Sequence, residues 1–219
     1  MQIRAFNKAI VDKEKLIAPR FFCRFRLSCK TVYIHVIGAF LYGYQARIVV
    51  PGWTGTYWMK HVNRIEALTH PFKSFWMNPA YRIPGGMFPI AARFTSQEYA
   101  PNTPITEMVV NSLITSHRDG DKIKRGKVTV GGLAWDGGYG INKVEVSSDG
   151  GKSWSSATLG QDLGRFAFRP WTFELNAKHG KNTVMVNATN KIGQSQVSNL
   201  IFNGAGYHNN VMQNITLTA

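Results

Sequence analysis

Four side chains stand where they could bind or act on an anion. Arg47 lies at the base of a short apolar segment that predicts a strand, and its planar guanidinium suits phosphate oxygens. Lys60 ends a segment whose backbone amides, near a predicted helix start, would form a natural anion site. The phenol of Tyr81 can hydrogen-bond an oxyanion, and Arg82 beside it could attract one.

Each of these residues also has a plainer explanation. Arg47 could be a surface arginine on a strand, and Lys60 a solvated helix lysine. Tyr81 could be a half-buried loop tyrosine packed by Trp76 and Pro84, with Arg82 pointing to solvent. The residue types alone therefore leave both readings open.

The cysteines and histidines give no metal-binding pattern. Five residues separate Cys23 from Cys29, which matches no common zinc spacing. The pair could form a disulfide, one thiolate could bind a metal, or both could be ordinary thiols, which is the simplest interpretation. The six histidines are scattered without ligand spacing.

The elements that would position these side chains fall into three regions. Residues 1–40 are basic and aromatic without clear periodicity, although the spacing allows a helix around Asn7–Ile17. Residues 41–105 begin with a strand over Ala46–Val50, break at Pro51–Gly52, and continue with helix-like apolar spacing over Thr56–Leu68. Loops rich in proline and glycine follow, and such loops usually serve a site or a packing surface.

Residues 106–219 are typical of an all-β domain, because short alternating segments are separated by glycine-containing turns. Seven strands are predicted: Met108–Thr115, Lys127–Ala134, Ile141–Ser147, Trp154–Leu159, Arg165–Leu175, Thr183–Thr189 and Gln194–Ser198. This number and spacing favour an immunoglobulin-like β-sandwich. No pair of cysteines brackets a tryptophan, so an antibody-type domain is excluded.

The net charge of +14 on 219 residues is the compositional outlier. A basic chain attracts nucleic acid, anionic membrane or small anionic ligands. Arg20–Lys30 interleaves cations with phenylalanines, but no RNA-binding signature accompanies it, and we expect no nucleic-acid binding. The longest apolar run, Val32–Tyr44, is too short and too interrupted to span a membrane, and no secretion signal is visible.

Several long segments resemble one enzyme family. Tyr42–Lys60, YGYQARIVVPGWTGTYWMK, resembles the pterin-binding strand and Pro-Gly turn of sulfite oxidases. Gly131–Leu159, with VEVSSDGGKSW, resembles the family's C-terminal dimerisation domain. Leu159–Trp171 and Gly206–Val211 are similar to the bacterial sulfite dehydrogenase branch.

The resemblance implies a mainly β chain with three parts. A truncated α+β fragment of the molybdopterin-binding domain would occupy 41–105, and the immunoglobulin-like dimerisation domain 106–219. Residues 1–40 would be an unassigned basic leader, frame-shifted or unrelated to the rest.

The same resemblance assigns roles to the residues introduced above. Arg47 and Lys60 match positions that contact the pterin of Mo-molybdopterin, and Trp58 and Met59 match positions whose backbone helps to hold it. Tyr81 matches the active-site tyrosine beside the molybdenum. Arg82 is a weaker candidate for attracting the substrate.

Some positions depart from the family pattern. Tyr42 stands where the family often has histidine, Tyr139 where vertebrate members place a substrate arginine, and Ala80 where they carry aspartate. Neither Cys23 nor Cys29 lies in a segment that resembles the family's molybdenum-binding cysteine loop. We therefore predict no metal ligand and infer an incomplete C-terminal portion of such an enzyme.

The implied reaction is the oxidation of sulfite to sulfate at Mo-molybdopterin. Because the chain has no C-x-x-C-H haem site, a separate cytochrome c would accept the electrons. The resemblance further implies a homodimer through the C-terminal domain and a periplasmic location. The alternative is a non-catalytic dimerisation or assembly module.

Overall fold

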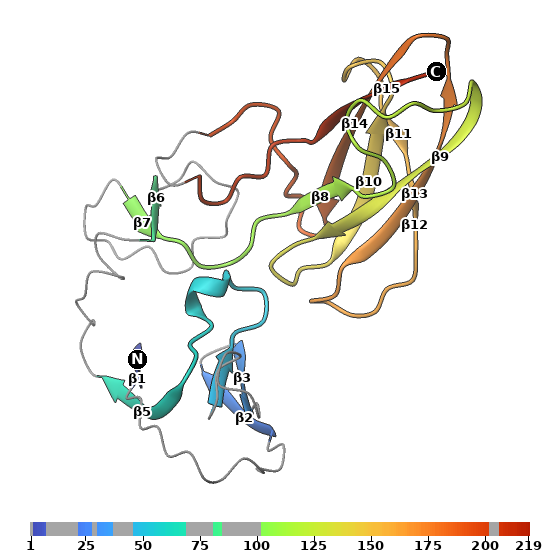
Figure 1. The fold of residues 1–219 in the computed structure, drawn as a ribbon. Coiled ribbons are helices and arrows are strands. Elements are labelled where there is room, and N and C mark those ends of the chain that lie inside the picture. The colour runs from blue at the N-terminus through green and yellow to red at the C-terminus, as the bar shows by residue number, and fades with distance from the viewer. Residues whose placement is uncertain are drawn as a thin grey trace, which may run out of the picture. The chain divides into compact units, whose positions relative to one another are not determined.

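The computed structural model describes residues 2–7, 22–27, 30–36, 46–68, 81–84, 102–201 and 206–219. These residues form two compact units. The first contains the described residues up to Pro84 together with 102–107, and the second contains those from Met108 onward. Figure 1 labels their strands.

The second unit is a sandwich of two antiparallel four-stranded sheets. One sheet has the order β12-β13-β9-β8 and the other β11-β10-β14-β15. The strands are β8 (Asn111–Ile114), β9 (Gly126–Trp135), β10 (Ile141–Ser147), β11 (Ser155–Ser156), β12 (Thr158–Leu159), β13 (Arg169–Ala177), β14 (Lys181–Asn190) and β15 (Asn214–Thr218). The predicted mainly β class and sandwich architecture are confirmed, and the arrangement is consistent with an immunoglobulin-like fold.

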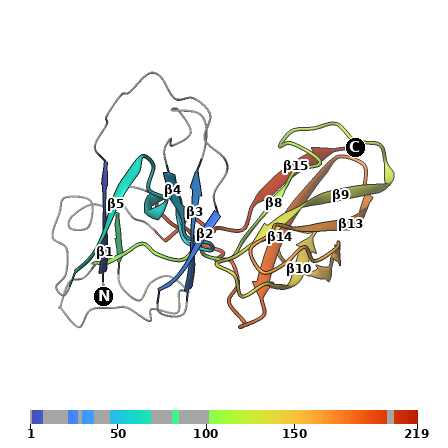
Figure 2. The ribbon, with the colours of Figure 1, turned by 90° about the horizontal axis from the view of Figure 1, so that it is seen from below.

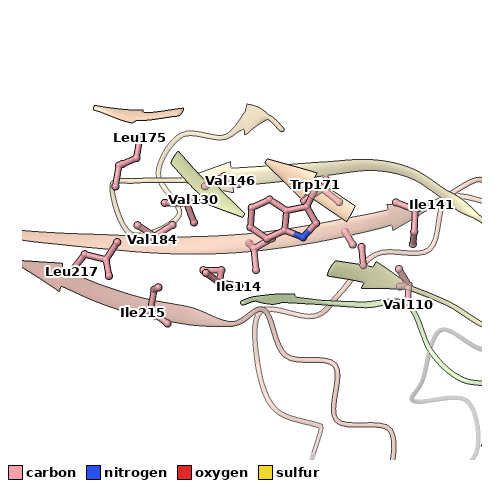
Figure 3. Packing of buried hydrophobic residues seen from close by; sticks show 14 of the residues in the cluster. Val110, Ile114, Val130, Ile141, Val146, Trp171, Leu175, Val184, Ile215 and Leu217 are labelled. Atoms are coloured by element: carbon pink, nitrogen blue, oxygen red, sulfur yellow. The ribbon is translucent and has the colours of Figure 1, made fainter. Parts of the chain in front are cut away.

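Strict alternation along the strands builds the core of the sandwich. Val144 and Val146 of β10 and Val184 and Val186 of β14 are fully buried, while Glu145 and Met185 between them are only partly buried. Side chains from both sheets meet in one cluster, and Figure 3 shows the Trp171 indole among them. Because aromatic and β-branched side chains fill the interior from both sides, the two sheets are held together mainly by apolar burial.

Gly132 of β9 makes room for that indole. It lies opposite Trp171 in the β9–β13 ladder and is itself buried. A Cβ placed on Gly132 would lie 2.6 Å from a ring carbon of Trp171 and would overlap the carbonyl oxygen of Leu113. The largest buried side chain of this unit therefore depends on a residue without a side chain at this position.

Hydrogen bonds of polar side chains, which we call the polar seam, join residues 110–114 to residues 196–213 in the sandwich. Its hydrogen bonds run from Ser112 Oγ to Gln196 Oε1 (2.5 Å), from Asn210 Nδ2 to the Val110 carbonyl (3.3 Å), and from the Ile114 amide to Gln213 Oε1 (2.6 Å). The Ala188 amide also donates to Gln196 Oε1, at 3.0 Å. The buried polar groups of Ser112 and Gln196 are thereby satisfied.

Most strands predicted from the sequence are confirmed, with shifted ends. The strand Ile141–Ser147 has the predicted bounds, whereas the predicted Trp154–Leu159 is two short strands. The predicted Gln194–Ser198 is not a strand: it contributes single bridges at Ser195 and Val197. Strand β15 was not predicted from the sequence.

The first unit contains three small antiparallel sheets: β1-β5, β2-β3-β4 and β6-β7. The strands are β1 (Gln2–Asn7), β2 (Phe22–Leu27), β3 (Lys30–Val36), β4 (Ala46–Val49), β5 (Val62–Leu68), β6 (Arg82–Pro84) and β7 (Asn102–Pro104). A 3-10 turn, η2 (Gly55–Tyr57), lies between β4 and β5. Figure 2 shows β1 beside β5 and β2, β3 and β4 side by side.

The predicted helix over Thr56–Leu68 is wrong. Only the single 3-10 turn forms there, and Val62–Leu68 is strand β5, paired with β1. His61 has φ 55°, in the left-handed region, which ends helical geometry before Val62. The β1 ladder then supplies long-range hydrogen bonds that the local apolar spacing could not reveal. The helix expected around Asn7–Ile17 falls outside the described residues beyond Asn7, which ends β1.

Candidate functional site

The strand β4 and the turn that follows it bring Arg47, Trp58 and Met59 together. The Ile48 amide donates a hydrogen bond of 2.9 Å to the Met59 carbonyl. Trp58 Nε1 donates to the Val50 carbonyl at 3.0 Å, and the Arg47 guanidinium carbon lies 5.5 Å from the centroid of the Trp58 ring. The indole therefore fixes one side of the guanidinium by a cation–π contact. Lys60 follows directly and is exposed.

Arg47 Nε and Thr54 Oγ1 are among the buried polar atoms of this segment, and they have no hydrogen-bond partner among the described residues. A buried donor without a partner is costly, so these atoms suggest a polar group that is supplied from outside the chain. A guanidinium and a hydroxyl are suitable donors to an anionic oxygen.

The turn between β4 and β5 also packs a partly buried phenol. The Trp53 and Tyr57 rings meet edge to face, with centroids 4.8 Å apart. Burial raises the pKa of Tyr57 to about 12, and the nearby positive charge of Arg82 only partly opposes this shift. The Tyr57 phenol therefore stays protonated at neutral pH. Arg82 lies close enough for its positive charge to affect the pKa of this phenol.

Tyr81 adopts an unusual backbone conformation. Its φ is 52°, in the left-handed region, where bulky residues are rare. The Ile105 amide donates a 2.9 Å hydrogen bond to the Tyr81 carbonyl, and the neighbouring Ile83 and Ile105 are fully buried. Such strain persists where the surrounding structure imposes it, and it concentrates at functional sites.

Backbone hydrogen bonds join the turn after β4 to the residues that follow β7, and β7 pairs with β6, which begins at Arg82. The Thr54 amide donates to the Thr106 carbonyl at 2.9 Å, and Trp53 forms a bridge with Glu107. The predicted residues thus form two groups in one unit: Arg47 with Trp58, Met59 and Lys60, and Tyr81 with Arg82.

Within the described part of the chain, no three histidine, cysteine, aspartate or glutamate side chains come close enough to hold a metal ion. Cys23 is described only as a position in β2, and Cys29, Tyr42 and Ala80 lie outside the described residues. The same described ranges contain no helix with the length and apolarity that a bilayer crossing requires.

Two residues of this site, Thr54 and Tyr57, were not predicted from the sequence. Both lie inside the quoted segment Tyr42–Lys60, but neither residue type stands out in it. Both are distinguished by burial. The Thr54 hydroxyl is buried without a hydrogen-bond partner, and burial strongly raises the pKa of the Tyr57 phenol. No pattern in the sequence carries that signal.

Comparison with known families decides where the chain belongs. The family model described as "Mo-co oxidoreductase dimerisation domain" matches residues 102–219, which is more than half of the chain. The chain belongs to the sulfite oxidase family of molybdenum-cofactor oxidoreductases. A second family model, "Oxidoreductase molybdopterin binding domain", matches residues 40–76.

Known sulfite oxidases are similar to part of the chain. Sulfite oxidase of Arabidopsis thaliana is 33% identical over 57% of this chain, and human mitochondrial sulfite oxidase is 30% identical over 66% of it. The aligned region covers 31% and 27% of those two proteins, so the chain spans less than a third of their length.

A solved structure has a similar fold. The sulfane dehydrogenase SoxCD from Paracoccus pantotrophus aligns with a TM-score of 0.66 and 22% sequence identity, over 90% of this chain and 54% of that one. Of the predicted site residues, Arg47, Trp58, Met59 and Lys60 lie in the matched molybdopterin-binding segment, whereas Tyr81 and Arg82 lie beyond it.

Proposed function

We propose that this chain is the C-terminal part of a molybdenum-dependent oxidoreductase of the sulfite oxidase or sulfite dehydrogenase type. It would act on sulfite in the periplasm, form sulfate and pass electrons to a cytochrome c. The observation that carries the proposal is Arg47: its Nε is buried and unpaired, and it lies in the segment matched by the molybdopterin-binding family model.

The residues around Arg47 suit the anionic end of a pterin cofactor. Arg47 and Thr54 offer donors that no described residue satisfies, and Lys60 adds an exposed charge next to the Trp58–Met59 backbone. Charge-assisted hydrogen bonds to phosphate are about twice as strong as neutral ones. In this proposal Arg47, Thr54 and Lys60 bind the phosphate, and the Trp58 ring keeps the guanidinium oriented.

Tyr81 and Arg82 are proposed to face the substrate. When bound, Mo-molybdopterin supplies oxygen-atom transfer and accepts two electrons. Tyr81 would donate its phenolic hydrogen to an oxygen of the anion, and Arg82 would raise the local concentration of sulfite. The strained backbone of Tyr81, tied to Ile105, would hold the phenol in a fixed direction.

The test measures molybdenum and turnover on the purified full chain, produced in a host that makes molybdopterin. The proposal predicts that the pterin is retained by the residues around Arg47, measured as molybdenum by mass spectrometry, and sulfite-dependent reduction of cytochrome c is measured alongside it. Arg47→Ala should lower the molybdenum content roughly tenfold or more, because it removes charge-assisted hydrogen bonds. Arg118→Ala, at an exposed arginine of the sandwich, is the matched control and should change nothing. A wild-type chain with neither molybdenum nor turnover would overturn the enzymatic proposal.

A second candidate function is a dimerisation or assembly module without catalysis. It is favoured by the densely packed sandwich, whose residues fall in the family model described as a dimerisation domain. We propose a homodimer through this unit in either case. A metal-free, inactive chain that is nevertheless a dimer would support the second candidate over the first.

A further inference from the structure

The positive charge of the sandwich is concentrated in two short segments. Residues 108–219 carry twelve lysines and arginines against seven acidic residues, a net charge of +5. The segments 118–127 (RDGDKIKRGK) and 178–181 (KHGK) hold seven of those cations and two of the acids, which is also a net of +5. The remainder of the unit, with five cations and five acids, is neutral. These two segments therefore account for the whole excess charge of the sandwich.

The strand ladders bring the two segments together. Ala177, at the end of β13, lies opposite Gly126, at the start of β9. Lys181 of β14 lies opposite Thr218 of β15, and Lys122 forms a bridge with the same threonine from the other side of β15. Because paired residues project from one face, Lys122 and Lys181 point to the same side. Figure 1 shows the turn between β13 and β14 and the start of β9 at the same end of the sandwich as the C-terminus. We call the two segments together the basic end.

The cations of the basic end are open to solvent and poorly compensated. All seven are exposed. Within the described part of the chain, Lys127 is the only one of them in an ion pair, with Glu174 at 3.7 Å. Asp121 accepts the backbone N–H of Arg118, and Asp119 accepts that of Thr216, each at 2.7 Å, so these carboxylates hold the turn in shape. Exposed like charges at this density attract an anionic partner.

The basic end lacks the features of a nucleic-acid or protein interface. It contains no phenylalanine, tyrosine or tryptophan on which a base could stack. Ile123, its one large apolar residue, is partly buried and packs against the core, so it provides no exposed apolar centre of the kind that protein interfaces have. Five of the seven cations are lysines, which act as flexible point charges, whereas bidentate recognition favours arginine. This composition suits a surface that is recognised by its charge alone.

We propose that the basic end attaches the protein to the surface of an anionic phospholipid membrane. An anionic bilayer attracts clusters of four to eight lysines and arginines, and each contributes about fivefold to the affinity. The attachment is electrostatic, with no apolar side chain entering the bilayer. Because β9 begins at the basic end and finishes at Trp135, the turn 136–140 that follows it points away from the lipid. The inference is independent of the proposed redox function.

The experiment measures the partition of the full chain onto sucrose-loaded vesicles by co-sedimentation at near-physiological ionic strength. Vesicles with equal parts of phosphatidylglycerol and phosphatidylcholine are compared with vesicles of phosphatidylcholine alone, to which we expect little binding. The triple variant Lys122→Gln, Lys124→Gln, Lys181→Gln removes three cations of the basic end. Its partition onto the anionic vesicles should be about 100-fold weaker, because three losses of about fivefold multiply.

A matched control separates the basic end from the general attraction of a chain with a net charge of +14. Lys143→Gln, Lys152→Gln, Lys191→Gln lowers the net charge equally, at exposed lysines elsewhere on the sandwich. Its partition should stay within about threefold of the wild type, because charges more than about 8 Å from the lipid are screened. Lys122→Arg, Lys124→Arg, Lys181→Arg keeps the charge and should bind like the wild type.

Three outcomes would overturn the proposal. The first is equal weakening, or no weakening, in the two glutamine variants, since the basic end would then have no special role. The second is equal binding of the wild type to the two kinds of vesicle. The third is double-stranded DNA that binds more tightly than the anionic vesicles at the same ionic strength and loses more affinity in the basic-end variant, which would assign this surface to nucleic acid.

Discussion

The replacement of Gly132 by alanine tests the packing of the sandwich most directly. A Cβ there would lie 2.6 and 2.8 Å from two ring atoms of Trp171 and would overlap the Leu113 carbonyl oxygen. Trp171 is only 1% exposed, so its ring has no empty space to move into. The neighbouring Gly131 is the matched control, because a Cβ on it would lie 3.2 Å from the Trp171 carbonyl oxygen.

The expected magnitude follows from these distances. To restore an ordinary contact of 3.4 Å from 2.6 Å, the indole must shift by about 0.8 Å, and β8 must also move away from β9. Overpacking of this kind costs about 1–3 kcal/mol and occasionally more, and we expect about 3 kcal/mol for Gly132→Ala. Gly131→Ala needs a shift of only a few tenths of an ångström, which the lower entropy of its unfolded chain largely offsets.

Thermal unfolding of the full chain, followed by near-ultraviolet circular dichroism, would measure the difference. A penalty of about 3 kcal/mol corresponds to a Tm lower by roughly 12–20 °C for a unit of this size. Hydrogen exchange of β9 and β14 amides assigns the transition to the sandwich, and two protein concentrations control for association. If Gly132→Ala unfolds within about 1 kcal/mol of Gly131→Ala, the packing argument is refuted.

Three further predictions concern other buried polar groups. Burial lowers the pKa of His208 from 6.5 to about 4, so the unfolded chain takes up this proton first, and stability falls as the pH drops between these values. Because the ring is only partly buried, we expect a loss of about 2 kcal/mol, measured by urea unfolding over a pH series. Asp136→Ala should cost about 2–3 kcal/mol in thermal denaturation, because the buried carboxylate accepts three backbone N–H bonds of the following turn. Gln196→Leu should cost about 3 kcal/mol and weaken hydrogen-exchange protection in β8 and β14, because two buried donors lose their acceptor.

Matched variants separate these effects from general destabilisation. His208→Asn removes the titrating group, and asparagine tolerates the φ of 55° at this position. Between pH 6.5 and 4, the stability of this variant should change only by the contribution of the other titrating groups. A wild type without that pH dependence would contradict the assignment. Asp136→Asn keeps one acceptor oxygen and should lose less than the alanine variant. Gln161→Leu, on an exposed loop, should stay within about 0.5 kcal/mol of the wild type.

The fold of the sandwich was predictable where the signal is local. Alternation in β10 and β14 is a property of a few neighbouring residues, and both strands were predicted. The short β15 was missed because its strand character comes from its ladder with β14, far away in sequence. Gln194–Ser198 alternates like a strand, but the Gln196 side chain turns into the polar seam and only single bridges form.

The candidate site was predictable only in part. The segment from Arg47 to Lys60 could be singled out by its resemblance to the family, and the structure brings Arg47, Trp58 and Met59 together. Their roles toward a cofactor remain predictions. The unpaired Thr54 hydroxyl and the partly buried Tyr57 phenol could not be predicted, because burial arises from packing and not from residue type.

The polar seam has a consequence for how the sandwich folds. Its hydrogen bonds join residues 84, 99 and 100 positions apart, so each one closes a very long loop of chain. The entropy of that closure is lost before the contacts are gained, and chains dominated by such distant pairings fold in milliseconds to seconds. A slow closure of these loops would lengthen the time in which unassembled apolar strands can associate with other molecules.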